Sequence, residues 1–155
     1  MQQVVEKLIE KRKTISTMES CLGGSLANEI TNVEGASEIF KFSAITYSNE
    51  FKIKMGVSRE ILEKYSVYSI ETADEMSKNI CLYTNSNYGV GVTGKLNRID
   101  EMNPYGDDNT VFISIYDNDN NEYYHGIVKV TAKKRQTNKN IIIKKIKGML
   151  LNILK

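Results

Sequence analysis

Segments typical of strands and of helices alternate along most of this chain, and that alternation restricts the folds it can adopt. Alternating or continuous runs of β-forming residues predict strands at 14–19, near 40–47 and at 88–92. Apolar residues at helical spacing lie between these strands. The predicted helices cover residues 2–12, 22–32, about 49–55, a turn capped by Ser58, a helix capped by Ser69, and 132–154. Strands joined by helices run parallel in one sheet.

The later part of the chain departs from this alternation. Residues 95–109 are polar and typical of a loop, whereas 111–116 and 123–130 alternate as two strands. The turn-forming segment Asp117–Asn121 joins those strands into a hairpin. An antiparallel hairpin added to parallel strands gives a mixed sheet. We therefore predict an α/β fold: one three-layer α/β/α domain over 1–155, with a mixed sheet and a late β-hairpin.

Composition excludes several classes of protein. Of the 155 residues 41% are hydrophobic and 26% charged, which is the balance of a soluble globular protein. No apolar run approaches the roughly 20 residues that span a bilayer, and the first residues do not resemble a signal peptide. We expect a cytoplasmic protein. Cys21 and Cys81 are too few for a disulfide framework and lack the spacing of metal ligands.

Positive charge is concentrated in the last segment. From Gly126 onward there are nine Lys and Arg and no Asp or Glu, so the first 125 residues carry a net charge of 2 − 9 = −7. The basic residues alternate with apolar ones, which favours an amphipathic helix with a solvated lysine face. Binding of an anionic small molecule by Lys134 or Arg135 is a second reading, and nucleic-acid binding is the third.

The segment Met18–Gly24 lies where a strand is expected to turn into a helix. Ser20 at that junction would face backbone N–H groups without intrahelical partners, which is the geometry of an acyl-transfer nucleophile. An ordinary helix N-cap is the alternative role for this serine. Cys21 could act as a thiolate nucleophile instead, although a small buried hydrophobic residue is the plainer interpretation. His125, the single histidine, is the one possible base for a Ser-His-Asp triad.

A second segment, Thr46–Lys52, follows the strand near 40–47 and begins a short helix capped by Ser48 or Asn49. The motifs Glu-Ser-Cys-x-Gly-Gly and Thr-Tyr-Ser-Asn-Glu-x-Lys together resemble the C-terminal domain of the competence/damage-inducible protein CinA. Stand-alone members of that family are nicotinamide-nucleotide amidohydrolases. The resemblance continues, in order, through Gly35-Ala36-Ser37, Gly56-Val57, Val67-Tyr68-Ser69, Val92-Thr93-Gly94, Lys134-Arg135 and Lys139.

The resemblance implies an activity and a catalytic set. Ser20, Tyr47 and Lys52 match the family's catalytic positions and would deamidate nicotinamide mononucleotide to nicotinate mononucleotide and ammonia. A neutral Lys52 would serve as base, Tyr47 would relay a proton or hold Ser20 in place, and N–H groups near Leu22 and Gly23 would stabilise the oxyanion. The plainer alternatives are a solvated Lys52 and a half-buried strand residue at Tyr47.

Around these residues we expect a pocket that binds the substrate. Glu19 is expected to orient the loop by hydrogen bonding. The expected substrate-binding residues are Glu19, Cys21, Leu22, Gly23, Gly24, Thr93, Gly94 and Arg135. The reaction needs no metal and no organic cofactor. As partners we expect a small-molecule nucleotide substrate, no nucleic acid, no membrane, and further copies of the chain in a homo-oligomer.

The chain departs from the family pattern in three places. Leu22 stands where threonine is usual, the loop that begins Lys95–Asp100 lacks the usual glycines, and of the Gly-Asp-Arg motif before the last helix only Arg135 remains. These changes predict a hydrolase that is weaker or differently selective, and restoring Leu22→Thr with a glycine-containing loop is expected to raise activity. The alternative is an inactive relative that binds a nucleotide or a protein partner.

Overall fold

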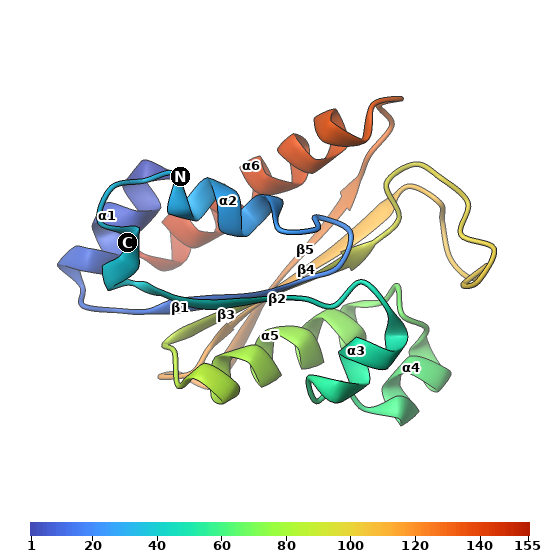
Figure 1. Ribbon diagram of the computed structural model, residues 1–155, viewed down its shortest axis with the longest axis horizontal. Helices are drawn as coiled ribbons and strands as arrows, with labels where there is room; N and C mark the ends of the chain where they lie inside the picture. Colours follow the sequence, from blue (N-terminus) through green and yellow to red (C-terminus); the bar gives the residue numbers. More distant parts are fainter.

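The computed structural model describes residues 1–155 as a five-stranded sheet between two layers of helices (Figure 1). One layer contains α1, α2 and α6, and the other contains α3, α4 and α5. The elements in chain order are α1 (Gln2–Glu10), β1 (Ile15–Glu19), α2 (Ser25–Thr31), the 3-10 turn η1 (Ala36–Glu38), β2 (Phe40–Ile45), α3 (Asn49–Lys54), α4 (Arg59–Tyr65), α5 (Ile70–Thr84), β3 (Tyr88–Gly94), β4 (Thr110–Asp117), β5 (Glu122–Lys129) and α6 (Arg135–Ile153).

The sheet is open and mixed, with strand order β2-β1-β3-β4-β5. Strand β1 pairs in parallel with β2 and with β3, so that Glu19 lies opposite both Ile45 and Val92. Strands β3, β4 and β5 pair antiparallel. The predicted three-layer α/β fold with a mixed sheet and a late hairpin is confirmed. The carboxyl ends of β1, β2 and β3 therefore meet at one edge of the sheet, which is where ligands bind in such folds.

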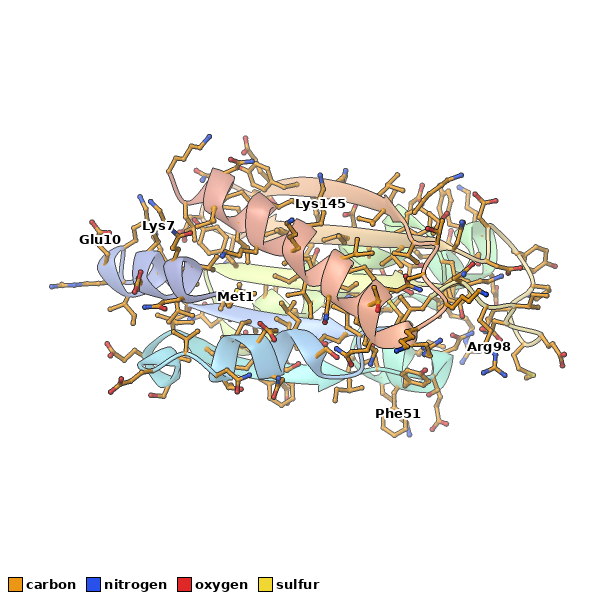
Figure 2. All side chains as sticks on the ribbon, turned by 90° about the horizontal axis from the view of Figure 1, so that it is seen from above. Met1, Lys7, Glu10, Phe51, Arg98 and Lys145 are labelled. Atoms are coloured by element: carbon orange, nitrogen blue, oxygen red, sulfur yellow. The ribbon has the colours of Figure 1, made fainter.

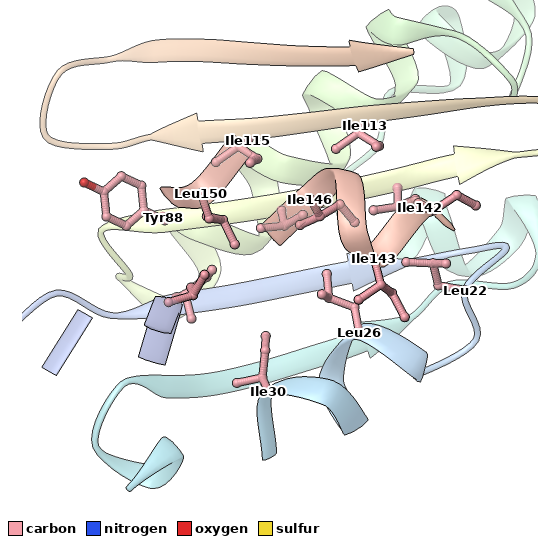
Figure 3. Packing of buried hydrophobic residues seen from close by; sticks show 14 of the residues in the cluster. Leu22, Leu26, Ile30, Tyr88, Ile113, Ile115, Ile142, Ile143, Ile146 and Leu150 are labelled. Carbon is pink, nitrogen blue, oxygen red and sulfur yellow. The ribbon is translucent and has the colours of Figure 1, made fainter. Parts of the chain in front are cut away.

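The main core lies between the sheet and the layer formed by α1, α2 and α6. It contains 23 buried residues. Figure 3 shows Leu26 of α2 next to Ile143 of α6, Ile30 directed into the same core, and Ile113 and Ile115 of β4 beyond the α6 residues Ile146 and Leu150. A smaller core on the opposite face consists of Met18, Ala44, Val57, Met76 and Ile80. Each buried aliphatic side chain contributes about 1.5–3 kcal/mol relative to full exposure.

Helix α5 packs unusually close to β3 because two glycines of that strand face it. A Cβ atom at Gly91 would lie 2.3 Å from the carbonyl oxygen of Ala73, and one at Gly89 would lie 2.0 Å from that of Ser77. No side chain fits in that space. Strand β3 is thus held firmly against α5 where it leads toward the edge that carries the candidate site.

Several element boundaries follow from residue chemistry. Ser48, Ser58 and Ser69 cap α3, α4 and α5 through their side-chain oxygens. The prediction that α2 starts at residue 22 was wrong, because Gly23 (φ 58°) and Gly24 (φ 90°) adopt left-handed backbone conformations that end any helix begun earlier. The last helix likewise begins at Arg135 and not at residue 132. No helix is both long and apolar enough to cross a membrane.

Candidate active site

Ser20 and Lys52 meet at the carboxyl edge of the sheet. Ser20 directly follows β1, and its backbone N–H donates to Val92 O at 3.0 Å. Helix α3 begins after its N-cap Ser48, and its residue Lys52 is buried. Lys52 Nζ donates to Ser20 Oγ at 3.0 Å and to Thr46 O at 2.7 Å. The expected contact between these two side chains is therefore present.

Burial makes Lys52 a plausible base. Its side chain is 1% exposed and forms no ion pair with a carboxylate. Loss of hydration lowers the pKa of Lys52 to about 8, against the opposing effects of nearby Cys21 and Asp100. At pH 7 about one lysine in ten is then neutral at this position. A neutral amine 3.0 Å from a hydroxyl can accept its proton.

Glu19 closes the N-terminus of α2 from inside the protein. Its fully buried carboxylate accepts hydrogen bonds from the backbone N–H groups of Gly24 (3.0 Å), Leu26 (3.1 Å) and Ala27 (2.8 Å). Ser20 therefore does not cap α2, and the N-cap alternative was wrong. The expectation that Glu19 orients the loop by hydrogen bonding agrees with these contacts. The expectation that Glu19 binds substrate does not, because Glu19 does not line the cavity.

The backbone after Ser20 supplies the candidate oxyanion donors. The N–H of Gly23 is already bonded to Ser20 O at 3.1 Å, so the expectation that it stabilises an oxyanion was wrong. The N–H groups of Cys21 and Leu22 have no acceptor within the protein. Donors that are free and fixed in position can receive a developing negative charge without reorganisation.

The side chain of Leu22 does not belong to the pocket. It is fully buried in the main core and lies beside Ile142 and Ile143 of α6 (Figure 3). A threonine hydroxyl at this position would replace part of that apolar contact and would not reach a ligand. The expectation that the Leu22 side chain, or a threonine hydroxyl in its place, contacts substrate was therefore wrong, and only the backbone N–H of Leu22 remains a candidate contact.

A cavity of about 1100 Å³ opens beside the Ser20–Lys52 pair. Its walls come from the segments that follow β1, β2 and β3, from the residues before α5, and from the start of α6. In Figure 2, Arg98 and Phe51 mark this end of the molecule, opposite Glu10. The lining residues are Ser20, Cys21, Tyr47, Ser48, Asn49, Lys52, Val67, Tyr68, Gly94, Lys95, Leu96, Arg98, Ile99, Asp100, Glu101, Met102, Asn103 and Arg135.

Tyr47 and Arg135 form a pair at this cavity. Arg135 Nη2 donates to the Tyr47 hydroxyl at 3.4 Å, and the Tyr47 side chain is 65% exposed. Tyr47 forms no hydrogen bond with Ser20 or Lys52, so in this structure it neither holds Ser20 nor relays its proton. Its hydroxyl instead contacts the guanidinium group of Arg135. Lys134 is the N-cap of α6 and does not line the cavity.

The other expected ligand-binding residues divide into two groups. Cys21 and Gly94 line the same cavity as Ser20, whereas Thr93 is buried and donates to Val67 O at 2.8 Å. Gly23 and Gly24 line a separate, smaller hollow of about 270 Å³ between α2 and α6. The structure therefore does not bring Thr93, Gly23 and Gly24 into the cavity that contains Ser20.

The competing nucleophile and bases are placed unfavourably. Cys21 lines the cavity but is almost fully buried, and burial raises the pKa of its thiol to about 12, so that it is protonated at neutral pH. Burial also raises the pKa of Cys81 to about 12. His125 belongs to β5, the edge strand at the other end of the strand order from β2, and its Nε2 lies 2.8 Å from Asp74 Oδ1. Neither residue lines the cavity. No three His, Cys, Asp or Glu side chains come together as ligands for a metal ion.

Sequence reasoning missed a carboxylate in the cavity wall. Asp100 accepts hydrogen bonds from the Tyr68 hydroxyl, from Asn103 Nδ2 at 3.0 Å and from the Met102 N–H at 3.1 Å. The bond from Tyr68, followed by that from Asn103, lowers the pKa of Asp100 below its usual value. The motif Val67-Tyr68-Ser69 marked Tyr68, but the loop 95–109 has no periodicity that would have identified Asp100.

Comparison with known proteins identifies the family. The model of the CinA C-terminal domain matches residues 1–153. The chain belongs to the CinA C-terminal domain family. A competence-damage inducible protein of Clostridium acetobutylicum is 50% identical over 88 residues, which are 56% of this chain and 21% of that protein. A CinA-like protein of Desulforapulum autotrophicum is 44% identical over 94 residues, covering 60% of this chain and 22% of that protein.

These CinA relatives are much longer than the segment they share with this chain, which spans roughly a fifth of their length. Solved structures match the whole fold. The competence/damage inducible protein CihA of Agrobacterium tumefaciens has a TM-score of 0.85 at 24% identity, covering 99% of this chain and 95% of that one. A competence or damage-inducible protein of Enterobacter asburiae has a TM-score of 0.87 at 22% identity, covering 99% and 94%. Similarity at this level establishes the shared fold.

Proposed function

We propose that this CinA-family chain is a serine amidohydrolase that deamidates nicotinamide mononucleotide to nicotinate mononucleotide and ammonia. The observation that carries the proposal is the buried Lys52 amine 3.0 Å from Ser20 Oγ, at the wall of a cavity of about 1100 Å³. A carboxamide is a poor electrophile, and its hydrolysis calls for an activated nucleophile. A serine whose proton passes to a partly neutral lysine meets that requirement.

The reaction can be written with the groups at hand. Neutral Lys52 takes the proton from Ser20 as Oγ attacks the carboxamide carbon, and the N–H groups of Cys21 and Leu22 receive the oxyanion. The Lys52 ammonium then returns the proton to the departing nitrogen, which leaves as ammonia. Water attacks the resulting ester with Lys52 again as base, so that the carboxylate product is released and Ser20 is regenerated.

Arg135 supports the nucleotide part of the proposal. Its guanidinium lines the cavity, is free of any ion pair, and is oriented by the Tyr47 hydroxyl. A planar fork of N–H donors suits a phosphate group. If Arg135 binds the phosphate, the ring of the substrate can lie at the Ser20 hydroxyl. Holding the reacting groups in this orientation lowers the activation free energy of the reaction.

The decisive experiment is ammonia release from nicotinamide mononucleotide by the purified protein in the presence of EDTA. Release that follows protein concentration is expected, with nicotinate mononucleotide as the second product. The bulky side chains of Arg98, Ile99 and Met102 in the cavity wall favour a second candidate, a relative that binds a nucleotide without hydrolysing it. Saturable nucleotide binding with no ammonia would support that candidate and refute the hydrolase.

A further inference from the structure

Asp100 is a fixed negative charge in a cavity that otherwise carries mainly cations. Three donors, from Tyr68, Asn103 and the Met102 backbone, hold its carboxylate in one orientation. No cationic side chain lies within 4.0 Å of it, so its charge is not neutralised by an ion pair. Glu101 also lines the cavity but has no hydrogen bond that fixes its carboxylate.

The basic residues that line the cavity differ in whether their charge is paired with a carboxylate, buried, or free to contact a ligand. Lys95 is paired with Asp108 at 2.9 Å, and Lys52 is buried beneath Ser20. Arg98 and Arg135 also line the cavity and have no carboxylate partner, and Arg135 Nη2 donates to the Tyr47 hydroxyl at 3.4 Å. The cavity therefore presents unpaired guanidinium groups and one carboxylate fixed by hydrogen bonds, together with the proposed nucleophile Ser20. A ligand with both an anionic group and a cationic ring complements this arrangement.

We propose that Asp100 selects ligands whose carboxamide-bearing ring is positively charged, so that the cavity prefers a pyridinium nucleotide over the same nucleotide in its neutral dihydropyridine form. This inference rests on the proposed function, since it places the ring near Ser20 and the phosphate at Arg135. A carboxylate near a cationic ring stabilises that ring and does nothing for a neutral one. Because Tyr68 and Asn103 already hold Asp100 in place, its side chain loses little conformational entropy when the ligand binds.

The placement of Asp100 agrees with such a role. It comes from the connection between β3 and β4, and this loop contacts α3 where Asn49 Nδ2 donates to Asn103 Oδ1 at 3.2 Å. Burial lowers the pKa of Lys52, and the negative charge of Asp100 opposes this effect by favouring the protonated amine. Ser20 and Asp100 line the same cavity, so a ring bound at Ser20 would lie in the cavity that contains this carboxylate.

Binding to the Ser20→Ala protein tests the proposal without interference from turnover. Titration calorimetry would give the dissociation constants of oxidised and reduced nicotinamide mononucleotide, which share the carboxamide, ribose and phosphate. We expect the oxidised form to bind about tenfold more tightly or better. Adding Asp100→Asn, which keeps the shape and the acceptor for Tyr68, should remove most of this preference by weakening the oxidised form alone. Adding Asp107→Asn removes the same charge from the same loop outside the cavity and should leave the ratio unchanged.

Each other result counts against the proposal. Equal affinity for the two forms, no binding of either, or an equal loss of both on Asp100→Asn would overturn it; the last result would mean that Asp100 contacts the ribose. If Asp100→Asn does not fold, Asp100→Ser in the same background provides the comparison. Failure of the proposed function has a different signature: wild-type protein would release no ammonia while the preference of the Ser20→Ala protein for the oxidised form persisted.

Discussion

Lys52 Nζ lies 3.0 Å from Ser20 Oγ although the two residues belong to different elements, α3 and the segment after β1. Parallel pairing of β1 with β2 brings the two elements together, because both strands end at the same edge of the sheet. The same lysine also donates to Thr46 O, so its amine is fixed by two acceptors. The backbone topology thus brings together the two side chains that we propose as nucleophile and base.

Replacing Ser20 by alanine should abolish ammonia release. The only hydrogen bond of its side chain is the one from Lys52, so the fold should persist while activity falls by at least about a thousandfold. The measurement is ammonia production, with circular dichroism as the check on folding. Ser25→Ala, five residues further on and outside the main cavity, is the matched control and should remain active. Substantial turnover by folded Ser20→Ala protein would exclude Ser20 as the nucleophile.

The pH dependence of kcat/KM should report the titration of Lys52. The base must be neutral, and its pKa is about 8, so the rate should increase roughly fiftyfold from pH 6 to pH 8 and level off above. Lys52→Met should remove this limb together with the activity. Lys54→Met, which changes an exposed lysine two residues away, should leave the profile unaltered. A flat profile through this range would speak against a lysine base.

Replacing Arg135 by alanine should raise KM for the nucleotide by roughly tenfold to a hundredfold, because charge-assisted hydrogen bonds to a phosphate contribute about 1.5–3 kcal/mol. The free energy of unfolding should change little, since Arg135 is exposed at the start of α6. Initial rates over a range of substrate concentrations separate KM from kcat. Lys134→Ala removes the same charge from the neighbouring residue, which does not line the cavity, and should leave KM nearly unchanged. If KM for Arg135→Ala equals that of wild type, the phosphate is bound elsewhere.

Leu22→Thr should destabilise the protein without raising its activity. The leucine side chain is fully buried in the main core, so the change removes apolar contacts and buries a hydroxyl, at a cost of about 1–3 kcal/mol. Denaturant unfolding measures this loss, and ammonia release measures the rate. An increase in rate would show that the threonine hydroxyl reaches the ligand and that the position is part of the site after all.

Gly91→Ala should destabilise the packing of α5 on β3 by on the order of 3 kcal/mol, because the added Cβ would lie 2.3 Å from Ala73 O. Gly148→Ala in α6 is the contrasting change. A Cβ there meets nothing within 4 Å, so the gain in helix propensity should stabilise the protein by about 0.5–1 kcal/mol. Thermal unfolding of the two variants should therefore shift in opposite directions. A neutral Gly91→Ala would mean that α5 can move away from the strand.

Much of the fold could be predicted because its signals are local. Alternation of strands and helices predicted the layers, and the serines at 48, 58 and 69 predicted three helix starts through their capping oxygens. The start of α2 was misplaced because Leu22 continues the apolar spacing of the helix, while the left-handed conformations of Gly23 and Gly24 interrupt it. Hydrophobic spacing alone does not contain that backbone information.

The candidate site was predictable only in part. The proximity of Ser20 and Lys52 follows from two motifs placed after neighbouring parallel strands. The direction of a side chain does not follow from such motifs, so Leu22 was assigned to the ligand although it packs in the core. Asp100 was missed because its importance depends on Tyr68, 32 residues away, and no local pattern links the two. Tertiary contacts of this kind are decided by the packing of the whole chain.

The connection between β3 and β4 supplies Asp100 and the bulky side chains of the cavity wall, yet it contributes no atom to the Ser20–Lys52 pair. In the proposed mechanism the nucleophile and the base therefore come from residues 15–52, whereas much of the cavity wall that would face the ring comes from residues 95–109. On our proposal, substitutions in the second stretch would change which ring is accepted without replacing Ser20 or Lys52, although loss of Asp100 would remove a charge that opposes the effect of burial on the Lys52 pKa. For protein engineering, the connection between β3 and β4 is then the segment in which to change substrate preference while Ser20 and Lys52 are kept.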